Sequence, residues 1–358
     1  MKSRNHDDMK IAVHTDPQTP EKSFASRWIA SLEDHGIQVL RMNLLEQGSM
    51  DQIRTAHGVM WHWFHSPDDK QTALKILPAI EYGLGIPVFP DLHTCWHYDE
   101  KVAQHYLLES IQAPRVKSWV FWKLSDAFDF LSSCTYPVVF KLSVGAGSAN
   151  VMRIDTRKEA MTFARRMFHE GIFPYTMNEY EKKYTLKTRK DFLDLVRRVF
   201  YGLRYTFIGK YPPLSGYFIP QKNYIYLQEF IPGNPHDIRI TVIGNRAFGF
   251  IRYNREGDFR ASGSGHIDHD PNKIPLDALK IAHDISLKNT FQSMAYDFLV
   301  GQNGKMLLNE ISYCYLSSAV YECPGYWDRD LKWHEGHVWP EDAHVEDFIA
   351  SISGKASE

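Results

Sequence analysis

The chain has 358 residues, and at roughly 150 residues per domain this length predicts about two domains. Its 44% hydrophobic and 23% charged residues are ordinary for a folded globular protein, and its net charge of −2 gives no global basic field for nucleic acid. No apolar stretch approaches the roughly 18 residues of a membrane span, and the polar N-terminus lacks a secretory signal, so we expect a cytoplasmic protein.

Strands and helices alternate over the first ninety residues. The hydrophobic patterns predict strands at 10–13, 37–42, 58–64 and 85–90, and helices at 22–35 and 71–82. Alternation of this kind is typical of a parallel sheet with helical crossovers. The four cysteines, by contrast, are far apart and form no CxxC pair, which argues against a zinc site or a disulfide scaffold.

The middle of the chain begins with a predicted helix at 100–110. Strands are expected at 116–122, 136–143 and 151–154, and a further helix at 157–171. Between the second and third of these strands lies the glycine-rich turn GAGSAN, from Gly145 to Asn150.

Residues 172–222 carry a local excess of positive charge. They contain ten Lys or Arg against four Asp or Glu, and twelve Phe or Tyr are interleaved with them. The simplest interpretation is an insertion whose basic face is solvated. The alternative is a flap or surface that handles an anion or a partner, since long insertions inside a domain are often functional.

Strong strand patterns follow at 224–231, 237–244 and 246–254, and a helix is predicted at 276–292. The strands 294–301 and 305–312 are joined by QNGK, in which Asn-Gly is a strong hairpin signal. The last thirty residues carry no readable motif.

Two of these segments could bind a nucleotide. Lys141 ends the apolar strand PVVFK just before GAGSAN, so one positive charge lies beside backbone N–H groups that could hold phosphates. In LQEFIPGN the strand stops at Pro232, which leaves backbone groups that an adenine edge could use, with Glu229 nearby. Each feature alone is also compatible with an ordinary surface turn.

Three arginines lie in the following strands and loop. Arg239, Arg252 and Arg260 could offer bidentate donors to phosphate or carboxylate oxygens, although any one of them could simply be solvated.

Asp297 and Glu310 occupy otherwise apolar strands, and Ser312 shares a strand face with Glu310. Such carboxylates need a partner, and a hard cation that bridges nucleotide phosphates is the natural one. The histidine-rich segments HIDHD and HEGH lack the HExxH spacing and predict no transition-metal site.

Taken in order, the motifs HYDEK, PVVFK–GAGSANV, LQEFIPGN–HDIRITVIG, FIRYNREGDFRASGSG and AYDFLVGQNGKMLLNEIS resemble the ATP-grasp superfamily over about residues 90–320. The nearest resemblance is to glutathione-synthetase-like members, including ribosomal-protein glutamate ligases. It implies an α/β and α+β fold: a parallel α/β domain at 9–92, an ATP-grasp domain of two α+β subdomains clasping ATP at 93–320, and a C-terminal tail at 321–358 packed on the core.

The resemblance also implies site residues. Phosphate contacts fall on Lys101, Lys141, Gly145, Gly147 and Ser148. The adenine hinge falls on Gln228, Glu229, Phe230 and Ile231, and Asp237 lies near the ribose or in the Arg239 network. Arg239, Arg252 and Arg260 face the γ-phosphate and the acyl-phosphate. Asp297, Glu310 and Ser312 hold Mg²⁺, with Mn²⁺ as an alternative; the family has Asn where Ser312 stands.

The function implied is an ATP-dependent ligase that joins a small or polymer-linked carboxylate, such as a peptide or surface-polysaccharide precursor, to an amine (or thiol) through an acyl-phosphate. No nucleic acid is expected as a partner. Two alternatives stay open: a catalytically weak ATP-binding docking module, and an ATP-dependent phosphotransferase.

Overall fold

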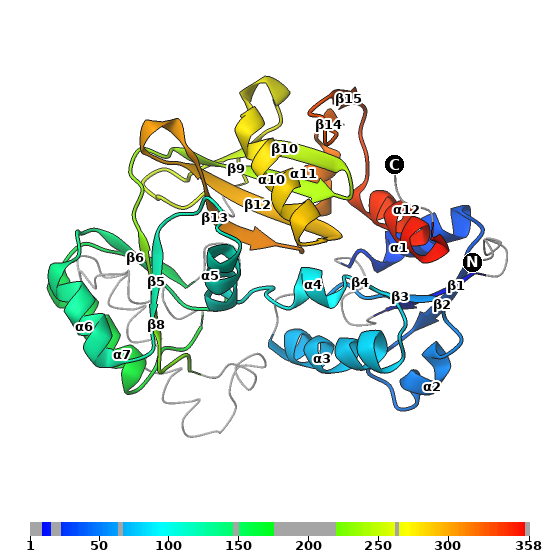
Figure 1. Cartoon of the computed structure of the whole chain (residues 1–358), viewed down its shortest axis with the longest axis horizontal. Helices are drawn as coiled ribbons and strands as arrows, with labels where there is room; N and C mark the ends of the chain where they lie inside the picture. Colours follow the sequence, from blue (N-terminus) through cyan, green and yellow to red (C-terminus); the bar gives the residue numbers. More distant parts are fainter. Residues whose placement is uncertain are drawn as a thin grey trace, which may run out of the picture. The chain divides into compact units, whose positions relative to one another are not determined.

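The computed structural model describes residues 9–15, 23–63, 67–145, 150–174, 220–261 and 265–354. The chain divides into two compact units (Figure 1). Unit 1 comprises Met1–Val116 and Ile231–Glu358, and unit 2 comprises Lys117–Phe230. Most of the basic insertion at 172–222 lies outside the described residues, as do Gly147 and Ser148. Among the described residues, no helix combines the length and apolar character needed to cross a membrane.

Unit 1 begins with a parallel four-stranded sheet in the order β2-β1-β3-β4. Its strands are β1 (Lys10–His14), β2 (Gln38–Met42), β3 (Gly58–Met60) and β4 (Val88–Phe89). They alternate with α1 (Ala25–Asp34), α2 (Ser49–Ile53), α3 (Pro67–Pro78) and a π-helical turn (Ala79–Gly83). Ile11 and Val13 belong to the core shared with α1, and Ala12 to the core shared with α3, so the sheet is covered on both faces. The predicted parallel α/β layer is confirmed.

The second sheet of unit 1 has seven strands in the order β13-β12-β9-β10-β14-β15, with β11 paired to β10. Their bounds are β9 (His236–Ile243), β10 (Arg246–Tyr253), β11 (Ile267–Asp268), β12 (Ser293–Val300), β13 (Met306–Ser312), β14 (Gly325–Trp327) and β15 (Trp333–Glu335). Helix α10 (Leu276–Lys288) packs against one face, where Ile240, Tyr296 and Phe298 are fully buried. The other face carries the charged residues described below.

Short helices complete unit 1. They are α4 (Leu92–Cys95), α5 (Lys101–Ser110), α11 (Ser317–Tyr321), α12 (Pro340–Ser353) and the 3-10 turns Pro271–Lys273 and Gln302–Gly304. The last of these is the predicted Asn-Gly turn, where Asn303 and Gly304 both have left-handed φ angles, +68° and +74°.

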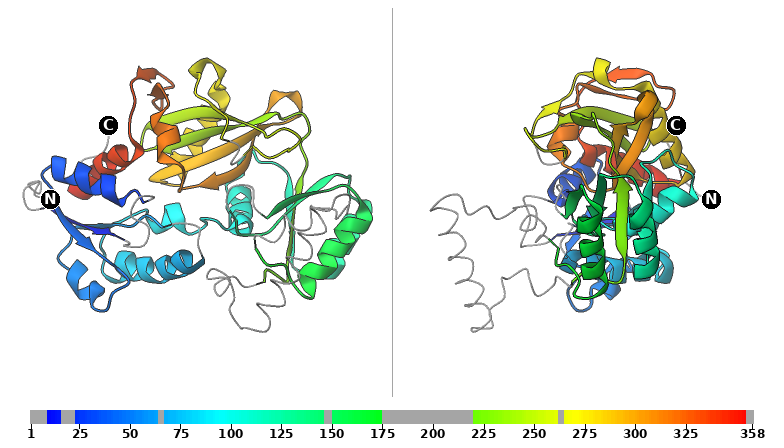
Figure 2. Two further views of the ribbon diagram at one scale, coloured as in Figure 1. Left: turned by 180° about the vertical axis from the view of Figure 1, so that it is seen from behind. Right: turned by 90° about the vertical axis from the view of Figure 1, so that its left-hand side faces the viewer.

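Unit 2 is an antiparallel sheet in the order β5-β8-β6-β7 with two helices on one face (Figure 2). Its elements are β5 (Ser118–Phe121), α6 (Leu124–Ser133), β6 (Val138–Lys141), β7 (Val151–Ile154), α7 (Arg157–Phe168) and β8 (Ile225–Glu229). Trp119 and Phe121 contact Phe130 of α6, and Phe140 contacts Phe163 of α7. These rings therefore form the core between sheet and helices.

The sequence analysis did not find α6 and α12. Helix α12 nevertheless carries ordinary boundary signals: Pro340 at its first turn, Glu341 and Asp342 beside it, and Gly354 in the left-handed conformation at its end. Helix α6 is ten residues long, as are α1 and α5, and it was missed although Ala127 and Leu131 give it a buried apolar face.

Among the buried histidines, three have strongly lowered pKa values, and we expect them to make stability fall in acid. Burial lowers the pKa of His62 to about 3 and that of His97 to about 4, and it lowers the pKa of His344 well below its ordinary value. The unfolded chain takes up these protons near pH 6.5 and the folded protein does not, so stability is present above pH 6.5 and is lost as pH falls.

Urea unfolding from pH 7.5 to 4 measures this effect. His97 is the sharpest probe, because both of its ring nitrogens lack a hydrogen-bond partner among the described residues. As the pH decreases below 6.5, the free energy of unfolding should decrease by about 1.4 kcal/mol per pH unit less in His97→Phe than in the wild type. The difference between the two proteins at pH 7.5 gives the effect of the substitution on packing alone. An unchanged slope would contradict the assignment.

Candidate functional site

Strand register gathers five charged side chains on one face of the second sheet of unit 1. Glu310 on β13 is the register partner of Asp297 on β12, and Asp297 is the partner of Arg239 on β9. Arg252 on β10 is the partner of Asp237, two residues before Arg239. Directly opposed residues of antiparallel strands share a face, as do residues two apart on one strand. Asp297 and Glu310 therefore lie on the same face of the hairpin formed by β12 and β13.

Four of these residues form a continuous ion-pair network, which we call the arginine–aspartate row. Arg239 donates from Nε to Asp297 Oδ1 at 2.6 Å and from Nη2 to Oδ2 at 2.7 Å. Arg252 donates to the two oxygens of Asp237 at 2.8 and 2.6 Å. Its Nη2 also lies 2.7 Å from Asp297 Oδ2. Arg252 therefore bridges both aspartates, whereas Asp297 is the carboxylate with which Arg239 pairs.

The row is shielded from solvent. The exposed fractions of its side chains are 15% for Arg239, 9% for Arg252, and 7% for both aspartates. Burial alone would raise the pKa of Asp297, but the Arg239 and Arg252 guanidinium groups outweigh it and hold that pKa well below its ordinary value. Asp297 is thus a carboxylate throughout the neutral range.

Lys101 and Glu310 form a second pair beside the row. Lys101 opens α5 and is 4% exposed, and its Nζ lies 3.5 Å from Glu310 Oε1. Burial lowers the pKa of Lys101, but the Glu310 and Asp99 carboxylates outweigh it and raise that pKa. The lysine expected to contact phosphate therefore contacts the carboxylate expected to bind metal.

Ser312 takes part in a local turn. Its hydroxyl donates to the Cys314 carbonyl at 2.7 Å and accepts from the Cys314 backbone N–H at 3.2 Å. These two bonds use the hydroxyl proton and one of the two lone pairs of its oxygen.

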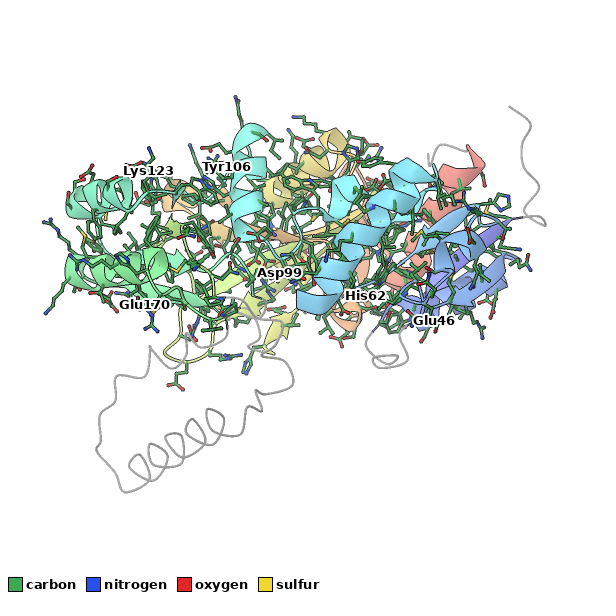
Figure 3. The ribbon with its side chains drawn as sticks, turned by 90° about the horizontal axis from the view of Figure 1, so that it is seen from below. Glu46, His62, Asp99, Tyr106, Lys123 and Glu170 are labelled. Atoms are coloured by element: carbon green, nitrogen blue, oxygen red, sulfur yellow. The ribbon has the colours of Figure 1, made fainter. Side chains whose placement is uncertain are left out.

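The same turn brings in residues that the sequence analysis did not find. The Sγ of Cys314 lies 3.2 Å from His62 Nε2, and His62 Nδ1 accepts the Phe24 backbone N–H at 3.4 Å. His62 lies two residues after β3, and Asp99 lies two residues before α5; both are labelled in Figure 3. No motif marks His62 and Cys314, because they are 252 positions apart and meet only through folding.

The donor set fits Mg²⁺ in part. Mg²⁺ is held in nucleotide sites by one or two carboxylates together with phosphate oxygens, and Asp297 and Glu310 are two facing carboxylates. Within the described ranges there is no cluster of three or more His, Cys, Asp or Glu that could hold a metal by itself. The carboxylates therefore fit a cation shared with phosphates, and the role of Ser312 as a further ligand stays a prediction.

Arg260 lies apart from the arginine–aspartate row in the chain, in the loop after β10. Its Nε and Nη2 each lie 2.9 Å from an oxygen of Asp258, two residues earlier. Its suggested contact with the γ-phosphate stays a prediction.

In unit 2, Lys141 and Gln228 share the sheet face opposite to the helices. Val139 is the register partner of Gln228, and Lys141 is that of Tyr226. Lys141 and Gln228 are each 4% exposed. Gly145, at the start of the glycine-rich turn, has a φ of +126°, which favours glycine.

The remaining hinge residues lie at and just beyond the end of β8. The Glu229 backbone N–H donates to the Lys117 carbonyl at 2.8 Å, and the guanidinium of Arg153 lies 4.7 Å from the Phe230 ring centroid. Ile231 is the first residue of the second segment of unit 1. Their contact with adenine stays a prediction.

The fold is found among known structures. No family model and no curated protein matches the chain. The structure is similar to D-cycloserine synthetase DcsG, with a TM-score of 0.57 at 12% identity over 95% of this chain and 99% of that one. It is also similar to the RimK domain protein ATP-grasp from Sphaerobacter thermophilus DSM 20745, with a TM-score of 0.52 at 14% identity over 95% and 99%. The chain has the ATP-grasp fold.

A third similar structure is the D-alanine–D-alanine ligase from Bacillus anthracis complexed with ATP. Its TM-score is 0.50 at 11% identity, over 97% of this chain and 99% of that one. These likenesses confirm the fold class, with its N-terminal parallel α/β layer and its antiparallel sheets. The boundaries 9–92, 93–320 and 321–358 stay a prediction.

We expect the arginine–aspartate row to contribute to the stability of the folded protein. Asp237→Ala would remove both acceptors that hold Arg252 Nε and Nη2 in a buried setting. Breaking such a pair costs about 3–5 kcal/mol because the remaining charge is stranded. Urea unfolding at pH 7.5 measures the loss.

The matched control is Glu33→Ala, which breaks an exposed pair with Arg41 whose side chains are 51% and 58% exposed. It should cost less than about 1 kcal/mol. Equal losses in the two variants would mean that burial does not set the strength of the row.

Proposed function

We propose that this ATP-grasp protein is an ATP-dependent ligase that joins a carboxylate to an amine, or to a thiol. The observation that carries the proposal is the charged face of unit 1, where two arginines and three carboxylates are gathered on a sheet of the ATP-grasp fold. Two of the similar structures are named as a ligase and a synthetase, and one of them contains ATP.

In the proposed reaction a substrate carboxylate oxygen attacks the γ-phosphorus of ATP, giving an acyl-phosphate and ADP. The amine then attacks the acyl carbon, the C–O bond to phosphate breaks, and the amine loses a proton as phosphate leaves. Neither step needs a covalent protein nucleophile. The protein has to position the reactants and neutralise the negative charge on the transferring group.

The chain offers residues for each task. Arg239 and Arg252 are planar bidentate donors suited to phosphate and carboxylate oxygens. Lys101 and Lys141 supply further positive charge, the latter beside the glycine-rich turn. Mg²⁺, or Mn²⁺ in its place, would be held by Asp297 and Glu310 and would supply charge neutralisation on the phosphates. We assign the adenine to the segment from Gln228 to Ile231.

The substrates are proposed by class. The basic, aromatic insertion at 172–222, which lies mostly outside the described residues, is compatible with an anionic acceptor such as an acidic sugar, a peptide carboxylate or a surface polymer. This favours a small or polymer-linked carboxylate as substrate.

Phosphorus NMR of ATP with Mg²⁺ tests the proposal, with pools of small carboxylates and amines offered separately and together. We expect ADP and phosphate to accumulate only when both a carboxylate and an amine are present. Lys141→Ala should lower this turnover by about 100-fold, because it removes one charge that neutralises the phosphates.

Other products would point elsewhere. A phosphorylated product that forms without an amine would favour a phosphotransferase, and AMP with pyrophosphate would mean adenylation. ATP binding without turnover would favour a docking module that has kept only its nucleotide site.

A further inference from the structure

In the arginine–aspartate row the two guanidinium charges balance the two carboxylate charges, and the four side chains pair with one another. Asp297 Oδ1 accepts from Arg239, and Oδ2 accepts from Arg239 and lies within ion-pair distance of Arg252. Asp237 is occupied on both oxygens by Arg252. The groups that the proposed function assigns to phosphate and to cation therefore pair with one another in the structure.

This arrangement disfavours each ligand alone. A phosphate that took Arg239 would leave the Asp297 carboxylate, which is 7% exposed, short of its bidentate partner. A cation that took Asp297 would leave the guanidinium of Arg239 without the carboxylate that now pairs with it. A buried charge that loses its partner is strongly destabilising, so either ligand by itself binds against a penalty.

When both ligands arrive, the number of ion pairs is kept. Asp297 exchanges a guanidinium for the cation, and Arg239 exchanges a carboxylate for a phosphate oxygen. We propose that nucleotide phosphates and a divalent cation bind to this face only together, by exchange of the Asp297–Arg239 ion pair. This inference rests on the proposed function, since it concerns the same nucleotide site.

The two arginines then have different tasks. Arg252 keeps both bonds to Asp237 when Asp297 leaves, so it stays anchored on the sheet and Asp237 is its positioning residue. Arg239 loses its partner and is also the more exposed of the two, at 15% against 9%. Arg239 is therefore the arginine that transfers to phosphate.

Lys101 and Glu310 also pair a cation with a carboxylate that the proposed function assigns to the nucleotide site, but their contact is longer. Lys101 and Glu310 are 3.5 Å apart, whereas the bonds of the row are 2.6–2.8 Å long. The Glu310 side chain is also 31% exposed. Glu310 is thus the carboxylate that a cation reaches first, and release of Asp297 is the step that depends on phosphate.

Calorimetric titration of the whole 358-residue chain with a non-hydrolysable ATP analogue tests the exchange without relying on activity. In the wild type we expect the analogue to bind about 100-fold more tightly with Mg²⁺ than in EDTA. Mn²⁺ alone, followed by its electron paramagnetic resonance signal, should not bind to this face at submillimolar concentration.

Asp297→Asn separates exchange from ordinary metal dependence. The neutral amide cannot hold Arg239 as a carboxylate does, so the arginine becomes available to phosphate without a cation. In EDTA this variant should bind the analogue about 10-fold more tightly than the wild type does, and Mg²⁺ should add little. A residue that only ligated metal would give no gain in EDTA.

Asp237→Asn is the matched control, because it removes the same charge from the same row but leaves Arg239 paired with Asp297. Its gain in EDTA should stay below about 3-fold, and its dependence on Mg²⁺ should persist. Equal gains in the two variants would mean that net charge alone is responsible, and would overturn the exchange.

The wild-type titrations decide the question even if a variant does not fold. Equal affinity in Mg²⁺ and EDTA, or tight binding of Mn²⁺ alone, would overturn the exchange and leave the proposed ligase function standing. Absence of analogue binding under both conditions would instead overturn the nucleotide site, and with it the proposed function.

Discussion

The burial of four charges on one sheet face is the constraint on which the rest of the candidate site depends. Guanidinium and carboxylate groups withdrawn from water are tolerated only when each meets a partner with good geometry. Arg239 and Asp297 meet because β9 and β12 pair in one register, and Arg252 and Asp237 meet because β10 pairs with β9 in one register. A slip of one residue would turn these charges toward α10.

The same alternation builds the core on the reverse side. In β9 the residues Ile238, Ile240 and Val242 face the core under α10, while Asp237 and Arg239 face the other way. Unit 2 repeats the principle, since Phe140 packs against the helices and Lys141 faces away from them. In both units, a strand that buries one face supplies rigid positions for polar side chains on the other.

The sequence predicted what depends on neighbours along the chain. The hairpin between the strands that carry Asp297 and Glu310 was predicted, because its Asn-Gly turn is a local signal. The pairing of Arg239 with Asp297 could not be predicted, because it joins residues 58 positions apart through strands that are not consecutive. The contact between His62 and Cys314 is more distant still. Helix α12 was missed although its boundary signals were present.

Ser312 shows how one side chain changes the demands on its neighbours. An asparagine amide at this position would extend farther toward a cation than a hydroxyl does, and the Ser312 hydroxyl is already bonded to the Cys314 backbone. A cation at this face would therefore rely on Glu310 and Asp297 more heavily than it would with three ligands. Glu310 is partly exposed, but Asp297 is enclosed by two arginines. The strength of the pairs that Asp297 makes with Arg239 and Arg252 determines how available this carboxylate is, and therefore how readily a cation can bind.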